Sequence, residues 1–262
     1  MSAEPVLLEK EGAIARIVLN RPDRGNAIDL PMAQGLVGAA VQCDADFSIR
    51  CVVLTGAGRL FCAGGDIGVF ASMPDRASAR LSELAGTLHM AVARLARMRK
   101  PLLVLVNGPA AGAGLSLAIL GDIVLAVRAA HFTAAYTAIG LTPDGSMTWQ
   151  LPRLVGLRRA QEMILTNRRV SAEEAERIGL VTRAVDDAAL AKEGAAITAV
   201  WLQSATAALG AARALLAQSF ETGLETQMEQ EARAIAAAGR GHDGQEGVAA
   251  FLGKRRPNFQ GE

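Results

Sequence analysis

Two apolar runs that each end in a Gly/Ala-rich turn constrain the fold of this chain more than any other feature. The first run, Cys51–Leu54, is followed by turn residues at 55–58 and 61–67, and the second, Val104–Val106, by residues 107–114. Each has the pattern of a buried strand that leads through a tight turn into a helix. Glycine permits close backbone approach, and the first turn of a helix has free N–H groups at the positive end of its dipole. The pair of turns therefore predicts backbone donors that can converge on one anionic atom.

Other interpretations of these turns stay open at this point. Either turn can be a plain strand-to-helix connection in an α/β protein. Residues 56–61 lack the last glycine of the dinucleotide-binding fingerprint, and no Gly-Lys-Ser/Thr sequence follows either turn. Residues 114–118 are one residue short of the nucleophile elbow of a serine hydrolase, because Ala118 stands where that motif has glycine.

Composition narrows the class of protein. The 262 residues can form one large domain with a sizeable core, and 51% hydrophobic with 20% charged residues is typical of a compact protein. The net charge is +1 and there is no dense Lys/Arg block, so nothing supports nucleic acid or a membrane surface as a partner. No stretch approaches the ~20 apolar residues of a membrane span, and no leader pattern is visible. We expect a cytoplasmic protein.

The three cysteines give no sign of a metal site. Cys43, Cys51 and Cys62 lie in apolar surroundings and lack the spacing of metal ligands. We expect them to be buried and reduced, which fits a reducing cytoplasm, and we expect no bound metal.

The order of predicted elements changes along the chain. Strands and helices alternate first, with strands expected at 6–10, 13–19, 49–54, 102–107 and 123–127 and helices at 30–44, 76–99 and 115–120. Asp29 is the expected N-cap of the first helix, and Ser171 opens a capping box. Beyond residue 144 the chain is mainly helical, with a strand at 181–185 and helices at 188–203, 205–220, 224–238 and up to about 254. These last helices cannot all bury their apolar faces, so we expect them to dock on another subunit.

Ordered motifs along almost the whole chain carry a family resemblance. They are Asn20-Arg21-Pro22 with Asn26-Ala27, Leu54-Thr55-Gly56, the stretches 61–67 and 106–114, Asp122-Ile123, the stretch 140–144 and the C-terminal stretch 251–259. In this order they resemble the motifs of the crotonase, or enoyl-CoA hydratase/isomerase, superfamily. The match is closest to its enoyl-CoA isomerase-like members of the phenylacetate type.

The resemblance implies a fold, an assembly and a substrate class. It implies an α/β chain with a crotonase-like spiral of ββα turns in residues 1–200 and a helical C-terminal oligomerisation region in residues 201–262. Members of the family form trimers and often dimers of trimers, so a homotrimer or homohexamer is expected. Their substrates are acyl-CoA thioesters, so coenzyme A is expected as part of the substrate and no separate cofactor is expected.

The resemblance also implies the residues of the site. The N–H groups of Gly65 and Ala113 would form an oxyanion hole for the thioester oxygen, where the two turns already predict donors. One such donor typically lowers a barrier by about 3 to 4 kcal/mol. The implied substrate and CoA contacts are Arg24, Ala27, Ala63, Gly64, Asp66, Ile67 and Tyr136, with Lys254 and Phe259 from the C-terminal segment. Arg24 can equally be an ordinary exposed arginine after a turn.

Two departures from the family pattern bear on the chemistry. Hydratases of this family carry a glutamate at each of two positions, which together orient a water molecule. Ser116 and Tyr136 stand at those positions here, and both side chains are protonated at neutral pH. Ser116 can be a small polar residue near a helix start, and Tyr136 a half-buried aromatic whose hydroxyl is bonded elsewhere.

One carboxylate remains at a position that the family uses for isomerisation. Asp144, in Gly140-Leu141-Thr142-Pro143-Asp144, stands where isomerases of the family have an acidic residue. A single carboxylate suffices for a 1,3-proton shift, because it can take a proton from one carbon and return it to another while the oxyanion hole holds the dienolate. Pro-Asp-Gly is also a good turn by itself.

Three hypotheses follow from these observations. We favour an enoyl-CoA isomerase with Asp144 as the proton shuttle, and the neighbouring enzyme class is an enoyl-CoA hydratase, a lyase. The second hypothesis is a serine hydrolase that uses Ser116, Asp144 and His242. The third is a non-catalytic acyl-CoA-binding protein that has lost the two glutamates.

Overall fold

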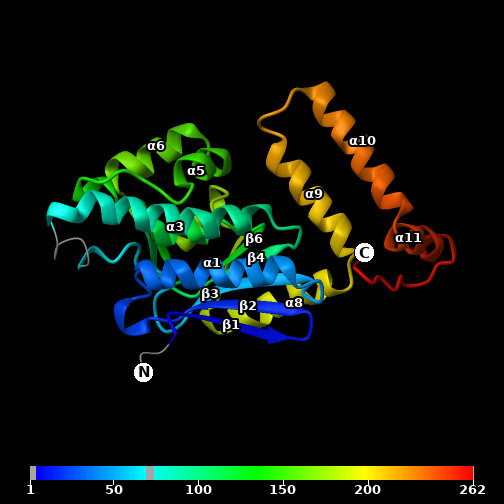
Figure 1. Ribbon diagram of the computed structural model, residues 1–262, viewed down its shortest axis with the longest axis horizontal. Coiled ribbons are helices and arrows are strands. Elements are labelled where there is room, and N and C mark those ends of the chain that lie inside the picture. The colour runs from blue at the N-terminus through cyan, green and yellow to red at the C-terminus, as the bar shows by residue number, and fades with distance from the viewer. Residues whose placement is uncertain (1–3, 69–73, 262) are drawn as a thin grey trace.

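A six-stranded sheet forms the centre of the computed structural model, which describes residues 4–68 and 74–261 (Figure 1). The strands lie in the order β1, β2, β3, β4, β6, β9. β1 pairs antiparallel with β2, and every later pair in the sheet is parallel. The strands are β1 (Val6–Glu11), β2 (Ile14–Leu19), β3 (Cys51–Gly56), β4 (Leu102–Val106), β6 (Ile123–Val127) and β9 (Arg183–Val185). Each predicted strand is therefore confirmed, with its ends shifted by at most a few residues.

A second, small sheet was not foreseen from the sequence. It joins β5 (Ala110–Ala111), β7 (His131–Thr133) and β8 (Val170–Ser171), in that order. These strands have only two or three residues, which is too short for an alternating pattern to show. The sheet matters because β5 lies within the second glycine-rich turn.

The helices follow the predicted order, and their caps act as expected. Asp29 accepts a hydrogen bond from the N–H of Met32 at 3.0 Å, and Ser171 accepts one from Glu174 at 3.2 Å. The helices are α1 (Leu30–Ala45), α3 (Ala77–Arg97), α4 (Ala113–Ala118), α5 (Met147–Val155), α6 (Leu157–Thr166), α7 (Ala172–Arg177), α8 (Leu190–Leu202), α9 (Thr206–Gln218), α10 (Leu224–Arg240) and α11 (His242–Leu252). Short 3-10 turns occupy Pro22–Arg24, Pro74–Arg76, Thr137–Ile139 and Asp187–Ala189.

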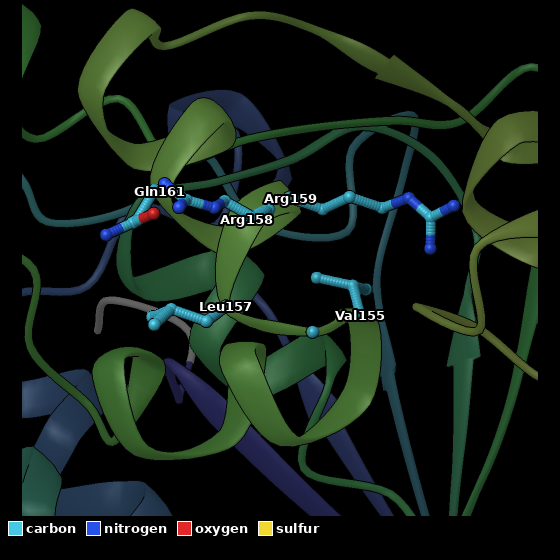
Figure 2. Close-up of a pocket in the computed structure, with 6 residues that line it drawn as sticks. Val155, Leu157, Arg158, Arg159 and Gln161 are labelled. Carbon is cyan, nitrogen blue, oxygen red and sulfur yellow. The ribbon is translucent and has the colours of Figure 1, made fainter.

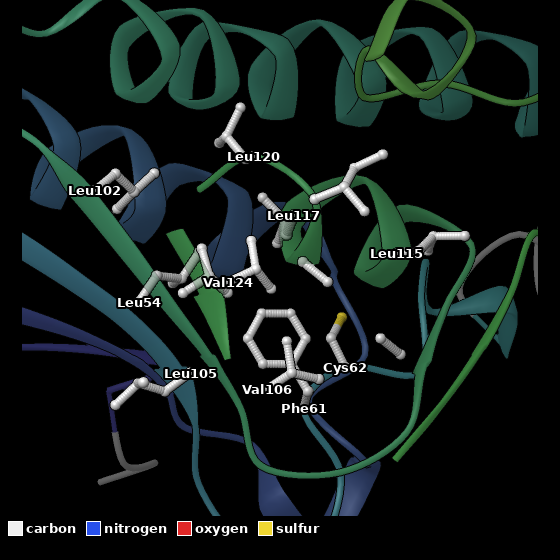
Figure 3. Close-up of a cluster of buried hydrophobic side chains, with 14 of the residues drawn as sticks. Leu54, Phe61, Cys62, Leu102, Leu105, Val106, Leu115, Leu117, Leu120 and Val124 are labelled. Atoms are coloured by element: carbon white, nitrogen blue, oxygen red, sulfur yellow. The ribbon is translucent and has the colours of Figure 1, made fainter. Parts of the chain in front are cut away.

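The hydrophobic core lies around β3, β4 and the short helix α4. All residues of β4 and α4 are buried. Figure 3 shows Phe61 and Cys62 in the same buried cluster as Val106 and Leu117. The three cysteines are buried and free, as expected, and burial raises the pKa of the Cys62 thiol to about 12. The first glycine-rich turn thus packs against buried apolar side chains of the core.

The last three helices form an arm beside the core (Figure 1). The chain end returns to the start of this arm, because the guanidinium of Arg50 donates to Thr206 Oγ1 at 3.0 Å and to the Phe259 carbonyl at 3.1 Å. Large apolar side chains on α9 to α11 and their connections remain more than half exposed, namely Leu216, Phe220, Leu224, Met228, Ile235, Val248, Phe251 and Leu252.

Within residues 4–68 and 74–261, no single helix is both long and apolar enough to cross a bilayer. One pair, Asp187–Leu202 with Thr206–Gln218, has the apolar length together but is bent by 106°.

Candidate active site

The two glycine-rich turns meet directly at the carboxyl ends of β3 and β4. The Cys62 carbonyl accepts the N–H of Ala111 at 3.0 Å, and a Cβ placed on Gly64 would lie only 2.9 Å from the Ala111 carbonyl oxygen and 3.6 Å from Gly112 Cα. A Cβ on Gly114 would collide with the Cys62 carbonyl. Glycine is therefore required for the two turns to come this close.

The predicted oxyanion donors have no hydrogen-bond acceptor in the described part of the chain. The Gly65 and Ala113 N–H groups donate to no other residue within 4–68 and 74–261. Ala113 is the first residue of α4, where an N–H group has no partner within the helix. A Cβ on Gly65 would meet no atom within 4 Å, so this residue borders open space. The structure brings the two predicted donors together on adjacent turns.

Asn26 holds the first turn from inside the protein. Its side chain is fully buried, and its amide donates to the carbonyls of Ala57, Leu60 and Phe61 at 2.9, 2.9 and 3.1 Å. Asn26 adopts a left-handed φ of 56°, a conformation that asparagine tolerates better than most residues. The two N–H groups of the amide are shared among these three carbonyls, and the path of the chain into Gly64 is thereby fixed.

Asp144 faces this pair of turns from the loop before α5. Its Oδ1 accepts the hydroxyl of Tyr136 at 2.5 Å, and its backbone carbonyl accepts the hydroxyl of Ser116 at 2.9 Å. A Cβ on Gly112 would lie 3.9 Å from Cε2 of Tyr136, so the Tyr136 ring links Asp144 to the oxyanion turn. The three residues at the family's acidic positions, Ser116, Tyr136 and Asp144, therefore form one cluster.

Tyr136 remains a hydrogen-bond donor in this cluster. Burial raises the pKa of its phenol, and the neighbouring Asp144 charge with its hydrogen bond raises it further. The phenol therefore stays protonated and cannot replace a missing glutamate as a base. It fixes Oδ1 of Asp144, whereas Oδ2 accepts no hydrogen bond from another residue within 4–68 and 74–261.

His89 is a site residue that sequence reasoning missed. It lies on α3, and its Nε2 is 3.0 Å from the N–H of Gly145 and 3.6 Å from Oδ2 of Asp144. Nothing in the local sequence marks it, because α3 shows only an ordinary amphipathic pattern and Gly145 is 56 residues further along the chain.

Most of the residues implied for CoA binding lie along the first turn and the segment that pairs with it. The N–H of Ala63 donates to the Gly25 carbonyl, and that of Ile28 donates to Gly64, at 2.9 and 2.7 Å. Arg24, Ala27, Ala63, Gly64, Asp66 and Ile67 are thereby brought together, with Arg24, Ala63 and Ile67 exposed. The carboxylate of Asp66 accepts a hydrogen bond from Arg21 at 3.2 Å, which links the first turn to the segment that carries Arg24 and Ala27.

Lys254 and Phe259 are not brought to this site within one chain. The Phe259 carbonyl binds Arg50, which precedes β3, whereas the two turns follow the carboxyl ends of β3 and β4. The ring of Phe259 packs against Gly247 of α11, and Lys254 is exposed at the end of that helix. These two residues therefore lie on the side of the amino ends of the strands, away from the two turns.

The serine hydrolase constellation is not assembled. Ser116 is fully buried and donates to the backbone carbonyl of Asp144, while His242 lies on α11 with its Nδ1 3.2 Å from Asp243. A catalytic triad needs the histidine within hydrogen-bond distance of the serine. That hypothesis is therefore wrong, because the fold carries His242 into the C-terminal arm.

In the described part of the chain, this cluster coincides with neither a metal site nor the surface hollow between α5 and α6. Within the described ranges, no three His, Cys, Asp or Glu side chains are grouped so that they could hold a metal ion. A hollow of about 600 Å³ lies between α5 and α6 (Figure 2), lined by Val155, Gly156, Leu157, Arg158, Arg159 and Gln161. It lies at the far end of α5 from Asp144 and contains none of the predicted site residues.

Comparison with known proteins places this geometry in a family. Residues 9–262 match the family model described as enoyl-CoA hydratase/isomerase. The chain is 38% identical to 1,2-epoxyphenylacetyl-CoA isomerase of Escherichia coli over 99% of both proteins. It is also 38% identical, over the full length of both, to a protein of Rhodobacter capsulatus named a probable enoyl-CoA hydratase.

Solved structures agree with the sequence comparison. The crystal structure of an enoyl-CoA hydratase from Polaromonas sp. JS666 superposes with a TM-score of 0.93 at 29% identity, covering 97% of this chain and 99% of that one. The expected crotonase-like spiral with C-terminal helices is thereby confirmed. This chain belongs to the enoyl-CoA hydratase/isomerase family of the crotonase superfamily, whose members process acyl-CoA thioesters.

Proposed function

We propose that this enzyme moves a double bond in an enoyl-CoA thioester, with Asp144 as the proton shuttle. The observation that carries the proposal is a carboxylate held beside two free backbone N–H groups, in a cluster where Ser116 and Tyr136 stand at the hydratase glutamate positions. An α-proton becomes removable when the charge that develops on the thioester oxygen is stabilised. Gly65 and Ala113 would supply that stabilisation.

The proton balance of the reaction needs no further reactant. Oδ2 of Asp144 removes a proton from C2 of a 3-enoyl-CoA, and the electron pair of that C–H bond moves into a dienolate whose oxygen rests on the two N–H groups. The protonated Asp144 then returns the proton to C4, which gives the 2-enoyl-CoA and restores the carboxylate. Tyr136 donates to Oδ1 throughout, so the same oxygen takes and returns the proton.

We propose that CoA lies along the strip of residues 24–27 and 63–67. The exposed side chains of Arg24 and Ile67 border this strip, and the Arg21–Asp66 pair shapes it. Lys254 and Phe259 would reach the same CoA only from a neighbouring subunit, because in one chain they lie on the side of the amino ends of the strands. Calorimetry with CoA and acyl-CoA tests this, and a complete lack of affinity would contradict it.

We propose a homotrimer or a dimer of trimers as the working assembly. The support is the row of exposed apolar side chains on α9 to α11, since exposed apolar patches of this kind mark contact surfaces. Sedimentation velocity should give a trimer or hexamer. A stable monomer at micromolar concentration would contradict the proposal.

Hydration is the second candidate function, because a relative with the same 38% identity bears the name of a hydratase. A panel of 2-enoyl- and 3-enoyl-CoA thioesters, followed by enoyl absorbance and mass spectrometry, separates the two. Isomerisation leaves the mass unchanged, and hydration adds one water molecule. Efficient hydration of a 2-enoyl-CoA without isomerisation would overturn the isomerase proposal.

A further inference from the structure

His89 touches the turn that carries Asp144 through a single nitrogen atom. Its Nε2 is 3.0 Å from the Gly145 nitrogen, with the backbone N–H as the donor. The same Nε2 is 3.6 Å from Oδ2 of Asp144, which is beyond hydrogen-bond distance. His89 thus binds the residue after Asp144, and the carboxylate stands beside the ring.

The contact requires one particular state of the His89 ring. A nitrogen that accepts an N–H group cannot itself carry a proton, so the ring must be neutral with its proton on Nδ1. An ion pair with Asp144 would need a proton on Nε2 and would therefore break the contact with Gly145. The two contacts of Nε2 exclude each other, and the observed geometry is that of the neutral ring.

The turn after Asp144 has an unfavourable backbone conformation and needs stabilising contacts. Gly145 and Ser146 both have left-handed φ values, of 62° and 72°, and the latter is unfavourable for a residue with a side chain. Gly145 is buried, and a Cβ on it would lie 2.9 Å from Cβ of Ser116. Its N–H would lack a partner without His89, and an unpaired buried donor favours a different path of the chain.

We propose that neutral His89 is a positioning residue that fixes the direction of the Asp144 carboxylate by accepting the N–H of Gly145. The proposal rests on the proposed function, in which Asp144 carries the proton. Ser116 binds the Asp144 carbonyl on one side of the turn and His89 binds the next N–H on the other side. The two contacts hold the peptide unit between Asp144 and Gly145 at both of its polar groups.

The first test compares His89→Ala with His89→Gln. Gln carries an acceptor oxygen the same number of bonds from Cβ as Nε2, so it can replace the contact without an imidazole. We expect His89→Ala to lower kcat on a 3-enoyl-CoA by about 10- to 100-fold with little change in KM, because small misplacements of a catalytic group have effects of this size. His89→Gln should restore kcat to within about threefold of the wild type.

The matched control is Met90→Ala, the exposed neighbour of His89 on α3. Alanine is a good helix former, so neither alanine variant should impair folding. Met90→Ala should leave kcat and KM unchanged. Loss of kcat in His89→Gln equal to that in His89→Ala would overturn the proposal, as would an effect of His89→Ala on KM alone.

The second test needs no activity at all. In protein labelled with ¹⁵N-histidine, the His89 signals are identified by their loss in His89→Gln, and ¹⁵N shifts of the neutral ring distinguish its two tautomers. We expect the proton on Nδ1 and Nε2 as the acceptor. A neutral ring with its proton on Nε2 would overturn the proposal. If the wild type isomerises no enoyl-CoA, the proposed function fails, and this measurement alone then decides whether His89 holds Gly145.

Discussion

The two halves of the candidate site are held in place by different means. The donors at Gly65 and Ala113 belong to the backbone, and the turns that carry them are fixed by glycine contacts and by the buried amide of Asn26. Asp144 presents a side chain, and it is fixed by other polar side chains, Tyr136 and Ser116 among them.

This difference determines which half of the site a single substitution can disrupt. Only proline removes a backbone donor at its own position, so with any other substitution the oxyanion half responds only to changes that move the main chain. The carboxylate half responds to the replacement of one functional group.

Asp144→Asn should produce the largest loss. Asn keeps the size of the side chain and an oxygen that can accept from Tyr136, but it cannot take a proton. We expect kcat on a 3-enoyl-CoA to fall by about 100- to 10,000-fold, the usual contribution of general acid–base catalysis, with the thermal midpoint nearly unchanged. Steady-state kinetics and calorimetric melting measure both quantities.

The control for this variant is Ser116→Ala, which removes only the hydrogen bond to the Asp144 carbonyl. Its effect on kcat should stay below about tenfold, since one neutral hydrogen bond is worth about 1 kcal/mol. A folded Asp144→Asn enzyme with near-wild-type turnover would show that the base lies elsewhere.

Gly64→Ala should cause the next largest loss, on the backbone side of the contrast. Gly64 has a φ of 104°, and the added Cβ would lie 2.9 Å from the Ala111 carbonyl oxygen, so the two turns must move apart. We expect kcat to fall by about 100-fold, because a displacement of about 1 Å in such a site has effects of this size.

Gly65→Ala is the matched control, because its Cβ meets nothing within 4 Å and its N–H is retained. It should keep the fold and the thermal midpoint, and its main effect should be a higher KM for acyl-CoA. Equal kcat losses in both variants would argue against separation of the turns as the cause.

The fold was largely predictable because its signals are local. Alternation of apolar residues and the caps at Asp29 and Ser171 each act within a few residues. The three-stranded sheet of β5, β7 and β8 was missed because strands of two or three residues carry no periodicity and form only when distant segments meet.

The site was predictable where it is made of backbone and less so where side chains meet. The glycine-rich turns predicted backbone donors, and the resemblance named Gly65, Ala113 and Asp144. The sequence left the partner of the Tyr136 hydroxyl open, and it gave no sign of His89, whose approach depends on how α3 packs over the loop before α5.

Asn26→Ala tests the buried support of the oxyanion turns. It removes the amide that serves three carbonyls and places alanine at a left-handed φ of 56°. We expect the free energy of unfolding to fall by about 3 kcal/mol in urea denaturation, since each unpaired buried group costs about 1 kcal/mol or more. Asn26→Gly should lose about 1 kcal/mol less, because glycine accepts this backbone conformation. Equal losses would show that backbone strain contributes little at this position.

The smallest expected effect is spectroscopic and tests the contact between Tyr136 and Asp144 in the carboxylate half of the site. Tyr136 is the sole tyrosine of the chain, so tyrosinate absorbance in an alkaline titration reports on it alone. Burial, and then the Asp144 charge, raise its pKa above the ordinary value of 10.0, so the native protein should show no tyrosinate at a pH where the urea-unfolded protein titrates.

The sign of the linked stability effect follows from this raised value. The contribution of Tyr136 to stability is fully present below about pH 10 and is lost as the pH rises, because the unfolded chain releases the phenolic proton first. In Asp144→Asn the charge is gone and burial remains, so the tyrosinate midpoint should fall relative to the wild type and still exceed that of the unfolded chain. A native midpoint equal to the unfolded one would contradict the buried Tyr136–Asp144 contact. An unchanged midpoint in Asp144→Asn would instead assign the shift to burial alone and remove the charge of Asp144 from the environment of the phenol.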